Sequence, residues 1–468
     1  MTKLQRPTRR GFLSAISLGT GAALMPGFAG MRAEAASVGG YKALVCVFLY
    51  GGWDSHDVLL PYDPASHGAF MNLRAGIAPE ASRGRSVLNP LTPRNAEEFG
   101  ARQFALPPEM PQLHQLFQGG RAGIVANVGP LVRPYDRDDW QSGVGGRPPR
   151  LFSHNDQQSV WQANAPEGAQ FGWGGLFADA ALLSGANPNA RAFTTISTTG
   201  DNLFLTGGQT TPFTVDRGGP TQINYLARAD RRRAWTGEEG EEIYQRLRRH
   251  FSAAQYQGDH LIAGDVAAIL GRALDNNETY AEALETEPAL GTSFPDNDLG
   301  NQLRTIAQTI AVRSRLGAGR QIFFAGTGGF DTHSNQVQAM GGLLSGLDSA
   351  LAAFQNAMDY LGEAQNVTTF TASDFGRTLA VNGDGTDHGW GAHHLVMGGA
   401  VRGGEIHGTP PPAALEHSQD AGQGRMIPTV SVDQYAASLG RWFGLSENEL
   451  NQALPNLANF QNTLDLTS

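Results

Sequence analysis

Two Asp-His pairs in the second half of the chain have the residue types and the spacing of metal ligands. Asp331 and His333 lie in "GFDTHSNQ", and Asp387 and His388 are adjacent in "GTDHGWG". On an extended segment, residues two apart point to the same side. Carboxylate oxygens bind hard divalent cations, and imidazole nitrogens favour zinc or iron. The pairs predict a divalent metal, zinc above manganese, iron or calcium; the alternative for the first pair is a turn-capping aspartate beside a surface histidine.

Two further aspartates follow apolar runs of the chain. Asp54 in "GGWDSHD" comes first after a Gly-Gly turn, which makes it a better candidate than His56 or Asp57. Asp374 begins "DFGR", where Arg377 is placed either to neutralise it or to bind an anion. We predict Asp54 and Asp374 as metal ligands, with a helix N-cap as the alternative role of Asp374.

A candidate nucleophile is Ser153 in "RLFSHNDQQ", at the expected start of a helix. The positive end of a helix stabilises an alkoxide and binds phosphate. The equal alternative is a capping serine, with Asp156 three residues on. The sequence contains no G-x-S-x-G elbow, no Walker loop and no dinucleotide fingerprint after a strand.

The elements that position these residues are expected to be buried strands alternating with helices. Helical patterns cover residues 107–120, 297–317 and 336–362. The apolar, strand-like runs are residues 43–50, 122–129, 192–197, 321–329, 366–373 and 394–401. This alternation predicts an α/β fold with a mostly parallel central sheet flanked by helices on both faces.

Ligands of such sheets gather at the carboxyl ends of the strands. Asp54 follows the first expected strand, Asp331 follows the run at 321–329, and Asp374 follows the run at 366–373. Three strands therefore bring carboxylates to the same end of the sheet, which is the strongest physical argument in the sequence for a metal site.

The first 35 residues read as a twin-arginine export signal. They contain "TRRGFL", a weakly apolar stretch and the small-residue site "AEA", and glycines and prolines interrupt the stretch well short of a membrane span. Their removal takes away five basic residues and one acidic residue, so the net charge changes from −10 to −14. This charge disfavours nucleic acid as a partner. We expect a periplasmic or secreted protein with no integral membrane span.

Residues 36–468 are expected to form a single domain. The segment 237–290 begins "GEEGEEIYQRLRRHFSAAQ", is charged and helical in period, and contains no strand-like run. We interpret this segment as a helical insertion.

The motifs "FLYGGWDSHDVLLPYD", "FSHNDQQSVWQ", "GFDTHSNQ", "SDFGRT" and "GTDHGWGAHH" occur in this order. Together they resemble the bacterial exported family called domain of unknown function 1501 (DUF1501), from residue 40 to the C-terminal "DQYAASLGRWFGL". That family looks like a branch of the alkaline phosphatase superfamily. The resemblance implies a two-metal site on a parallel sheet.

The resemblance also implies roles for particular residues. Asp54 is similar to the metal aspartate of the first strand, and Ser153 lies where the superfamily nucleophile begins its helix. Asp331 and His333 resemble the Asp-His pair of one metal. Asp374, together with His388, resembles the metal ligands that come later in the sequences of the superfamily.

The sequence departs from the superfamily pattern at two positions. Asn335 stands where a histidine four residues after the first aspartate is usual, and Phe375 stands where histidine usually follows the later aspartate. Either Asp387 and His388 form the true Asp-His pair, or one metal position is altered or empty.

The sequence therefore leads to one main expectation and one alternative. The first is an exported metal-dependent hydrolase of phosphate esters or related anionic esters, with Ser153 as nucleophile and Arg377 holding the oxygens of a small anionic substrate. The alternative is a non-catalytic member of the same fold that binds an anion, a polysaccharide or a partner protein.

Overall fold

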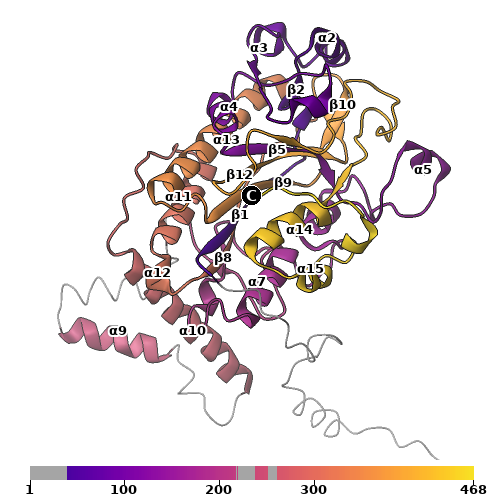
Figure 1. Ribbon diagram of the computed structural model, residues 1–468. Helices are drawn as coiled ribbons and strands as arrows, with labels where there is room; N and C mark the ends of the chain where they lie inside the picture. The colour runs from indigo at the N-terminus through magenta and orange to yellow at the C-terminus, as the bar shows by residue number, and fades with distance from the viewer. Residues whose placement is uncertain (1–38, 218, 220–237, 251–260, 468) are drawn as a thin grey trace, which may run out of the picture. The chain divides into compact units, whose positions relative to one another are not determined.

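The computed structural model describes residues 39–217, 219, 238–250 and 261–467 (Figure 1). Val38–Ser468 form one compact unit. The export signal expected in residues 1–35 lies outside the described residues. Within the described ranges, no helix has both the length and the apolar character needed to cross a bilayer.

A large sheet lies at the centre of the domain. Its strands are β1 (Lys42–Leu49), β5 (Ala122–Gly129), β6 (Thr195–Ser197), β7 (Phe213–Thr214), β8 (Arg320–Thr327), β9 (Val367–Ser373), β12 (Ala392–Met397), β13 (Ile406–His407) and β14 (Val430–Ser431). Their spatial order is β13-β5-β12-β9-β1-β8-β6-β7, and β14 also pairs with β5. All pairings are parallel except those of β12, which is antiparallel to β5 and β9.

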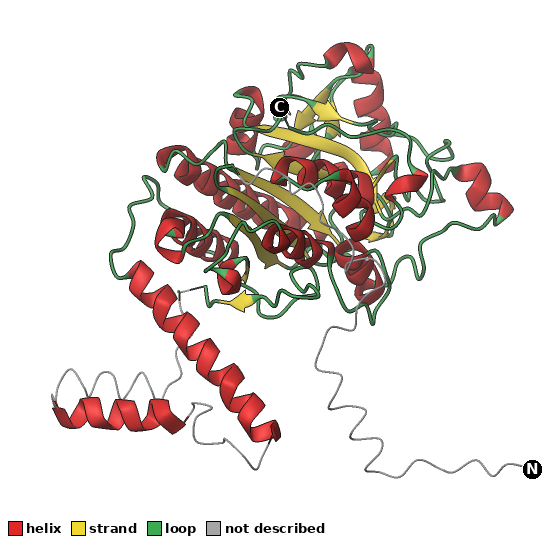
Figure 2. Cartoon of the chain, turned by 60° about the horizontal axis from the view of Figure 1, so that its bottom comes forward, coloured by secondary structure: helices red, strands yellow, loops and turns green. Residues whose placement is uncertain are grey.

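Helices cover both faces of this sheet (Figures 1 and 2). The covering helices are α4 (Pro111–Gln118), α7 (Trp173–Leu183), α11 (Asp298–Ala311), α13 (Gln336–Tyr360), α14 (Val432–Phe443) and α15 (Glu447–Ala453). Alternate side chains of β1 point to opposite faces. Val45 and Val47 pack with α4, α11 and α13, whereas Cys46 and Phe48 pack with α7, α14 and α15. The expected fold class is confirmed, and burial on both faces explains why the strands are apolar without interruption.

Smaller elements surround the sheet. The remaining α-helices are α2 (Pro64–Leu73), α3 (Glu80–Arg83), α5 (Arg137–Ser142), α6 (His154–Ala163), α9 (Glu238–His250), α10 (Leu261–Leu284) and α12 (Arg313–Leu316). A three-stranded sheet contains β2 (Leu60–Pro61), β4 (Phe104–Leu106) and β3 (Asn89–Pro90), and β10 (Arg377–Val381) pairs antiparallel with β11 (Thr386–His388). In the segment interpreted as an insertion, the described elements are α9 and α10.

Candidate metal centre

The carboxyl ends of three neighbouring strands meet at Gly51. Strand β1 lies between β8 and β9, and the three strands end level with one another. Gly51 has a φ of +111°, and a Cβ atom added there would lie 2.5 Å from the backbone nitrogen of Asp331. On its other side, the Gly51 N–H donates to Asp374 Oδ1 at 3.3 Å. A glycine at this position therefore lets the segments after β8 and β9 approach each other closely.

His154 reaches the same place from the start of α6. The loop before it holds Arg150 and Phe152 in left-handed backbone conformations, with φ of 49° and 74°. Such conformations cost bulky residues roughly 1–3 kcal/mol each and persist where the surrounding contacts impose them. Here the Phe152 carbonyl oxygen lies 2.8 Å from His388 Nδ1, and the Arg150 carbonyl accepts from Gln157 Nε2. The loop thus sets the direction in which His154 enters the site.

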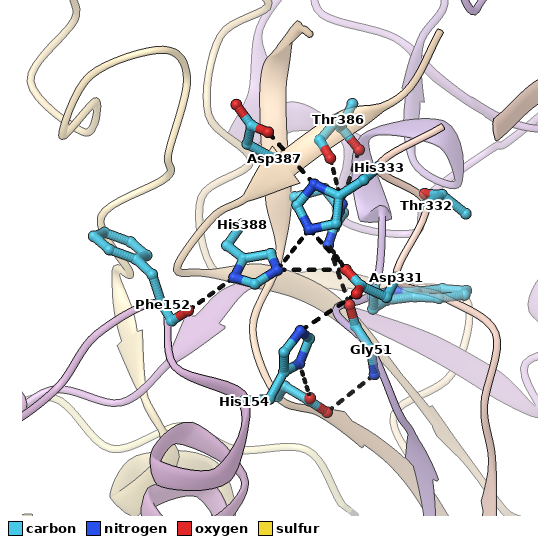
Figure 3. Close-up of polar contacts among 12 residues, drawn as sticks. Gly51, Phe152, His154, Asp331, Thr332, His333, Thr386, Asp387 and His388 are labelled. Carbon is cyan, nitrogen blue, oxygen red and sulfur yellow. Dashed lines mark hydrogen bonds and ion pairs between the residues drawn. The ribbon is translucent and has the colours of Figure 1, made fainter. Parts of the chain in front are cut away.

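The side chains of His154, Asp331 and His388 converge from three separate segments (Figure 3). His154 Nε2 lies 3.5 Å from Asp331 Oδ2, and His388 Nε2 lies 3.4 Å from Asp331 Oδ1. One ligand atom from each of the three lies within 4.8 Å of the others. All three side chains are partly exposed, so a substrate in solvent has access to them. We call these three residues the metal cluster.

The outer nitrogen of each ring in the metal cluster has its own partner. His154 Nδ1 lies 2.7 Å from Asp374 Oδ2, and His388 Nδ1 lies 2.8 Å from the carbonyl oxygen of Phe152. Metal-binding histidines have this arrangement, because a carboxylate or carbonyl accepts from one ring N–H and leaves the other nitrogen free for the ion. When the rings are neutral and carry their hydrogen on Nδ1, each Nε2 is an acceptor that faces the Asp331 carboxylate, itself an acceptor.

This donor set fits a cation. Acceptors that face one another are stabilised by a positive ion placed among them. Two imidazole nitrogens and one carboxylate oxygen, with other positions open, match a catalytic zinc site, whereas calcium takes oxygen ligands. The hydrogen bond that His154 donates to Asp374 raises the pKa of His154, whereas burial lowers the pKa of His388 and favours its neutral, ligating form. The metal cluster could therefore hold zinc or a similar transition metal.

His333 lies on the exposed side of the metal cluster. Its Nε2 is 2.8 Å from His388 Nε2 and 3.1 Å from Asp331 Oδ1. Its Nδ1 is 3.5 Å from Asp387 Oδ1, which also accepts from Asn382 Nδ2 at 2.8 Å. His333 thus offers a further ring nitrogen to an ion, and Asp387 stands behind it, next to His333 and not next to His154.

Arg377 pairs with Asp331 and not with Asp374, the partner considered from the sequence. Its Nη1 donates to Asp331 Oδ1 at 2.7 Å and to the Gly51 carbonyl at 3.2 Å, while Nε and Nη2 donate to Thr386. Burial opposes the ionisation of Asp331, but the hydrogen bond and the charge of Arg377 outweigh it and hold the pKa of Asp331 below its usual value. Arg377 therefore keeps this carboxylate ionised and in place.

Asp54 does not join the metal cluster, although it was predicted as a ligand and follows β1. Its carboxylate is fully buried and accepts from Arg74 at 2.6 and 3.1 Å, and from Gln336 Nε2. Burial would raise the pKa of Asp54, but the charge and the hydrogen bonds of Arg74 lower it. Because both oxygens are engaged in this ion pair, the structure places Asp54 in a structural role behind the site.

Asp374 contacts the site through another residue. Its carboxylate is fully buried and accepts from His154 Nδ1, from Gln158 Nε2 at 2.9 Å and from the Gly51 N–H. It is thus neither a helix N-cap nor one of the three metal-cluster residues. The contacts make Asp374 a positioning residue for the His154 ring.

Ser153 is the N-cap residue of α6, but its hydroxyl makes no cap to the helix backbone. Ser153 Oγ donates to Asp156 Oδ2 at 2.9 Å, and Asp156 also pairs with Arg150 at 3.2 Å. The predicted nucleophile is therefore directly before His154 in the chain, with its hydroxyl held by a carboxylate.

His154 is the functional residue that the sequence reasoning missed. Its motif "FSHNDQQSVWQ" drew attention to the serine, and a single histidine at a helix start carries no metal-ligand spacing. The only available signal was its position at the first residue of a helix whose N-terminus was already expected to face the site. The missing information is tertiary, since Asp331 is 177 positions away in the sequence.

The sequence matches a family model described as "Protein of unknown function (DUF1501)" over residues 148–454. This match is about two thirds of the chain and contains all three residues of the metal cluster. Comparison of the sequence with curated proteins finds no significant match.

Several solved structures are similar to this chain at low identity. PsFucS1 sulfatase from Pseudoalteromonas sp. has 9% identity and a TM-score of 0.36, covering 92% of this chain and 74% of its own. The C-terminal periplasmic domain of EcEptC from Escherichia coli, in complex with Zn, has 11% identity and a TM-score of 0.34, covering 92% and 90%. Ps i-CgsB in complex with k-i-k-neocarrahexaose has 10% identity and a TM-score of 0.33, covering 90% and 77%. These values are too low to carry an argument about activity.

Proposed function

Since the chain belongs to the DUF1501 family of proteins of unknown function, we propose its function from its own residues: an exported, metal-dependent hydrolase of phosphate esters or related anionic esters. The observation that carries the proposal is the arrangement of two histidines around Asp331. Both rings are held at Nδ1 by the protein, and both present Nε2 to the same carboxylate. Protein structures use this arrangement for metal ions.

The proposed ion is zinc, held by His154, Asp331 and His388, with His333 as the additional ligand on the exposed side. When bound, the cation supplies positive charge to the oxygens of an anionic ester and lowers the pKa of a hydroxyl group next to it. Partial exposure of the cluster suits a small substrate that arrives from solvent.

Ser153 is the proposed nucleophile. Its Oγ forms the bond to the phosphorus or sulfur atom of the ester while the bond to the alcohol oxygen breaks. The hydroxyl proton passes to Asp156 Oδ2, which already accepts it, and the departing alcohol takes a proton from water. The hydroxide left from that water then attacks the serine ester and breaks its bond to Ser153 Oγ, which releases the anion, and Oγ takes its proton back from Asp156.

The test is to measure metal content and turnover together on the mature chain, residues 36–468. Asp331→Asn is expected to lose both the metal and the turnover of aryl phosphate and aryl sulfate esters. Ser153→Ala is expected to retain the metal and lose turnover. Asp359→Asn is a matched control, because Asp359 is also half-exposed and paired with an arginine, Arg121 at 3.1 Å, outside the metal cluster. Stoichiometric metal without turnover of any ester in the panel would refute the hydrolase.

A non-catalytic binding role for the same site is the second candidate. It is favoured by the Ser153 hydroxyl, which is bound to Asp156 while Asp156 is held by Arg150. In this case the loaded protein retains a phosphorylated or sulfated ligand without turnover, and Ser153→Ala binds it equally well. Equilibrium binding of inorganic phosphate and of a sulfated oligosaccharide to both forms separates the two candidates.

The proposed export route rests on the twin arginines Arg9 and Arg10 in the first 35 residues. Replacement of both by lysine is expected to leave the protein in the cytoplasm. Fractionation of cells that express the two forms tests this part of the proposal separately from the chemistry.

A further inference from the structure

The N-terminal half of α10 has an exposed apolar stripe. Ile262, Val266 and Ile269 are 81%, 50% and 58% exposed, and Ala273 continues the line. Successive members are four, three and four residues apart, which is the spacing of the apolar seam of a coiled coil. Single exposed apolar residues are common, but four at this spacing form one continuous face along the helix. We call these four residues the α10 stripe.

The rest of α10 has partners within the chain. Its C-terminal half packs on the domain through Tyr280 and Ala283, both buried in the main core, and the Tyr280 hydroxyl lies 2.6 Å from Thr309 Oγ1 of α11. The helix is therefore anchored at one end, and the α10 stripe occupies the other.

Helix α9 lies beside α10 (Figure 1) and makes ion pairs with it. Arg248 of α9 pairs with Asp275 at 2.6 Å and with Glu278 at 2.8 Å. With 3.6 residues per turn, these two acidic residues point away from the line that runs through Val266 and Ile269. The contact with α9 therefore leaves the α10 stripe facing outward.

Two exposed charges flank the α10 stripe on one side. Asp265 and Arg272 are seven residues apart and both exposed. If a second copy of α10 lies antiparallel, with Val266 facing Ile269 of the second copy, Asp265 lies beside Arg272 of the second copy. The two-fold axis repeats this pair, so both ion pairs form together. A parallel arrangement instead sets Asp265 beside Leu270 of the second copy.

We propose that the α10 stripe is the interface of a homodimer in which two copies of α10 pair antiparallel. The second copy is the occupant because the stripe is complementary to itself in both apolar spacing and charge. The antiparallel arrangement also places the two domains at opposite ends of the helix pair, since α10 is anchored at its C-terminal half. This inference does not depend on the proposed hydrolase activity.

The first test is the molar mass of the mature chain, measured by sedimentation velocity at concentrations up to about 50 μM. A dimer is expected. Ile269→Glu and Val266→Glu are each expected to raise its dissociation constant by roughly tenfold or more, because each change places two carboxylates in the seam. Leu183→Glu is the matched control, since Leu183 is 59% exposed at the end of α7 and Ile269 is 58% exposed. Circular dichroism confirms that each variant remains folded.

The second test is charge reversal, which reports on the orientation. Asp265→Arg and Arg272→Asp are each expected to weaken the dimer, and the double variant is expected to restore it. A monomeric wild-type chain overturns the proposal, as does a dimer that Ile269→Glu leaves intact. A double reversal that fails to restore the dimer overturns the antiparallel pairing.

Discussion

The replacement Asp374→Asn tests whether this buried carboxylate positions His154 for a metal ion. Asp374 Oδ2 lies 2.7 Å from His154 Nδ1, and Asp374 Oδ1 accepts from the Gly51 N–H. Asparagine has nearly the same shape, so packing is preserved while the negative charge is removed. The amide can also turn its NH₂ group toward the ring, which removes the partner that holds Nδ1 as a donor.

The expected loss follows from the contact itself. A hydrogen bond to a charged group contributes about 1.5–3 kcal/mol. Replacement of the outer partner of a metal-binding histidine lowers metal affinity by about 10–100-fold, which is about 1.4–2.7 kcal/mol. The two estimates agree, so we expect zinc to bind to Asp374→Asn with an affinity lower by this factor and with unchanged stoichiometry.

The assay is a competition titration of zinc against a chromophoric chelator at fixed pH. Asp387→Asn is the control, because it also removes one negative charge near the cluster but contacts His333 and Asn382, not His154. It is expected to change the affinity by much less. An unchanged affinity in Asp374→Asn would refute the positioning role. The loss of a whole equivalent of metal would instead identify Asp374 as a ligand.

Three further predictions concern the surroundings of the site and the fold. Burial raises the pKa of Asp433 to about 6. Between about pH 4 and 6 the folded state therefore binds more protons than the unfolded state, so stability falls as the pH rises through this window. Urea titrations at several pH values should show that Asp433→Asn lacks this loss of about 3 kcal/mol; an equal loss would contradict the assignment. Arg74→Met should lower the free energy of unfolding by about 3–5 kcal/mol, because it leaves the buried Asp54 carboxylate without its arginine. The double variant Arg74→Met with Asp54→Asn should recover part of this lost free energy in the same titration. Gly51→Ala should displace Asp331 and lower the affinity for zinc. Gly328→Ala is the control and should not lower it, because no atom lies within 4 Å of a Cβ atom added at Gly328. Equal zinc affinities of the two variants would disprove the close approach at Gly51.

The fold was largely predictable from the sequence. The run "ALVCVFLY" is apolar at consecutive positions because β1 is covered on both faces, and its observed bounds differ from the prediction by one residue. The reversed direction of β12 was not predictable, because a short apolar run looks the same in either orientation.

The site was predictable only in part. Asp331 and His388 were identified because their pairs lie after buried strands or between glycines, where side chains reach the carboxyl edge of the sheet. Asp54 also follows a buried strand, but its carboxylate does not join the metal cluster, because it forms a buried ion pair with Arg74. Local pattern cannot distinguish a carboxylate that meets an arginine from one that meets histidines.

By itself, the sequence determined the class of fold, the end of the sheet at which the site lies and the residue types available there. These properties depend on periodicity and on the order of the elements, which are local or nearly local features of the chain. Only the tertiary structure decided that His154 joins Asp331 and His388, and that Asp374 holds His154 from behind. Those contacts join segments more than 50 residues apart, and which atoms meet is decided by how the strands, the loop before α6 and the glycine at position 51 pack together.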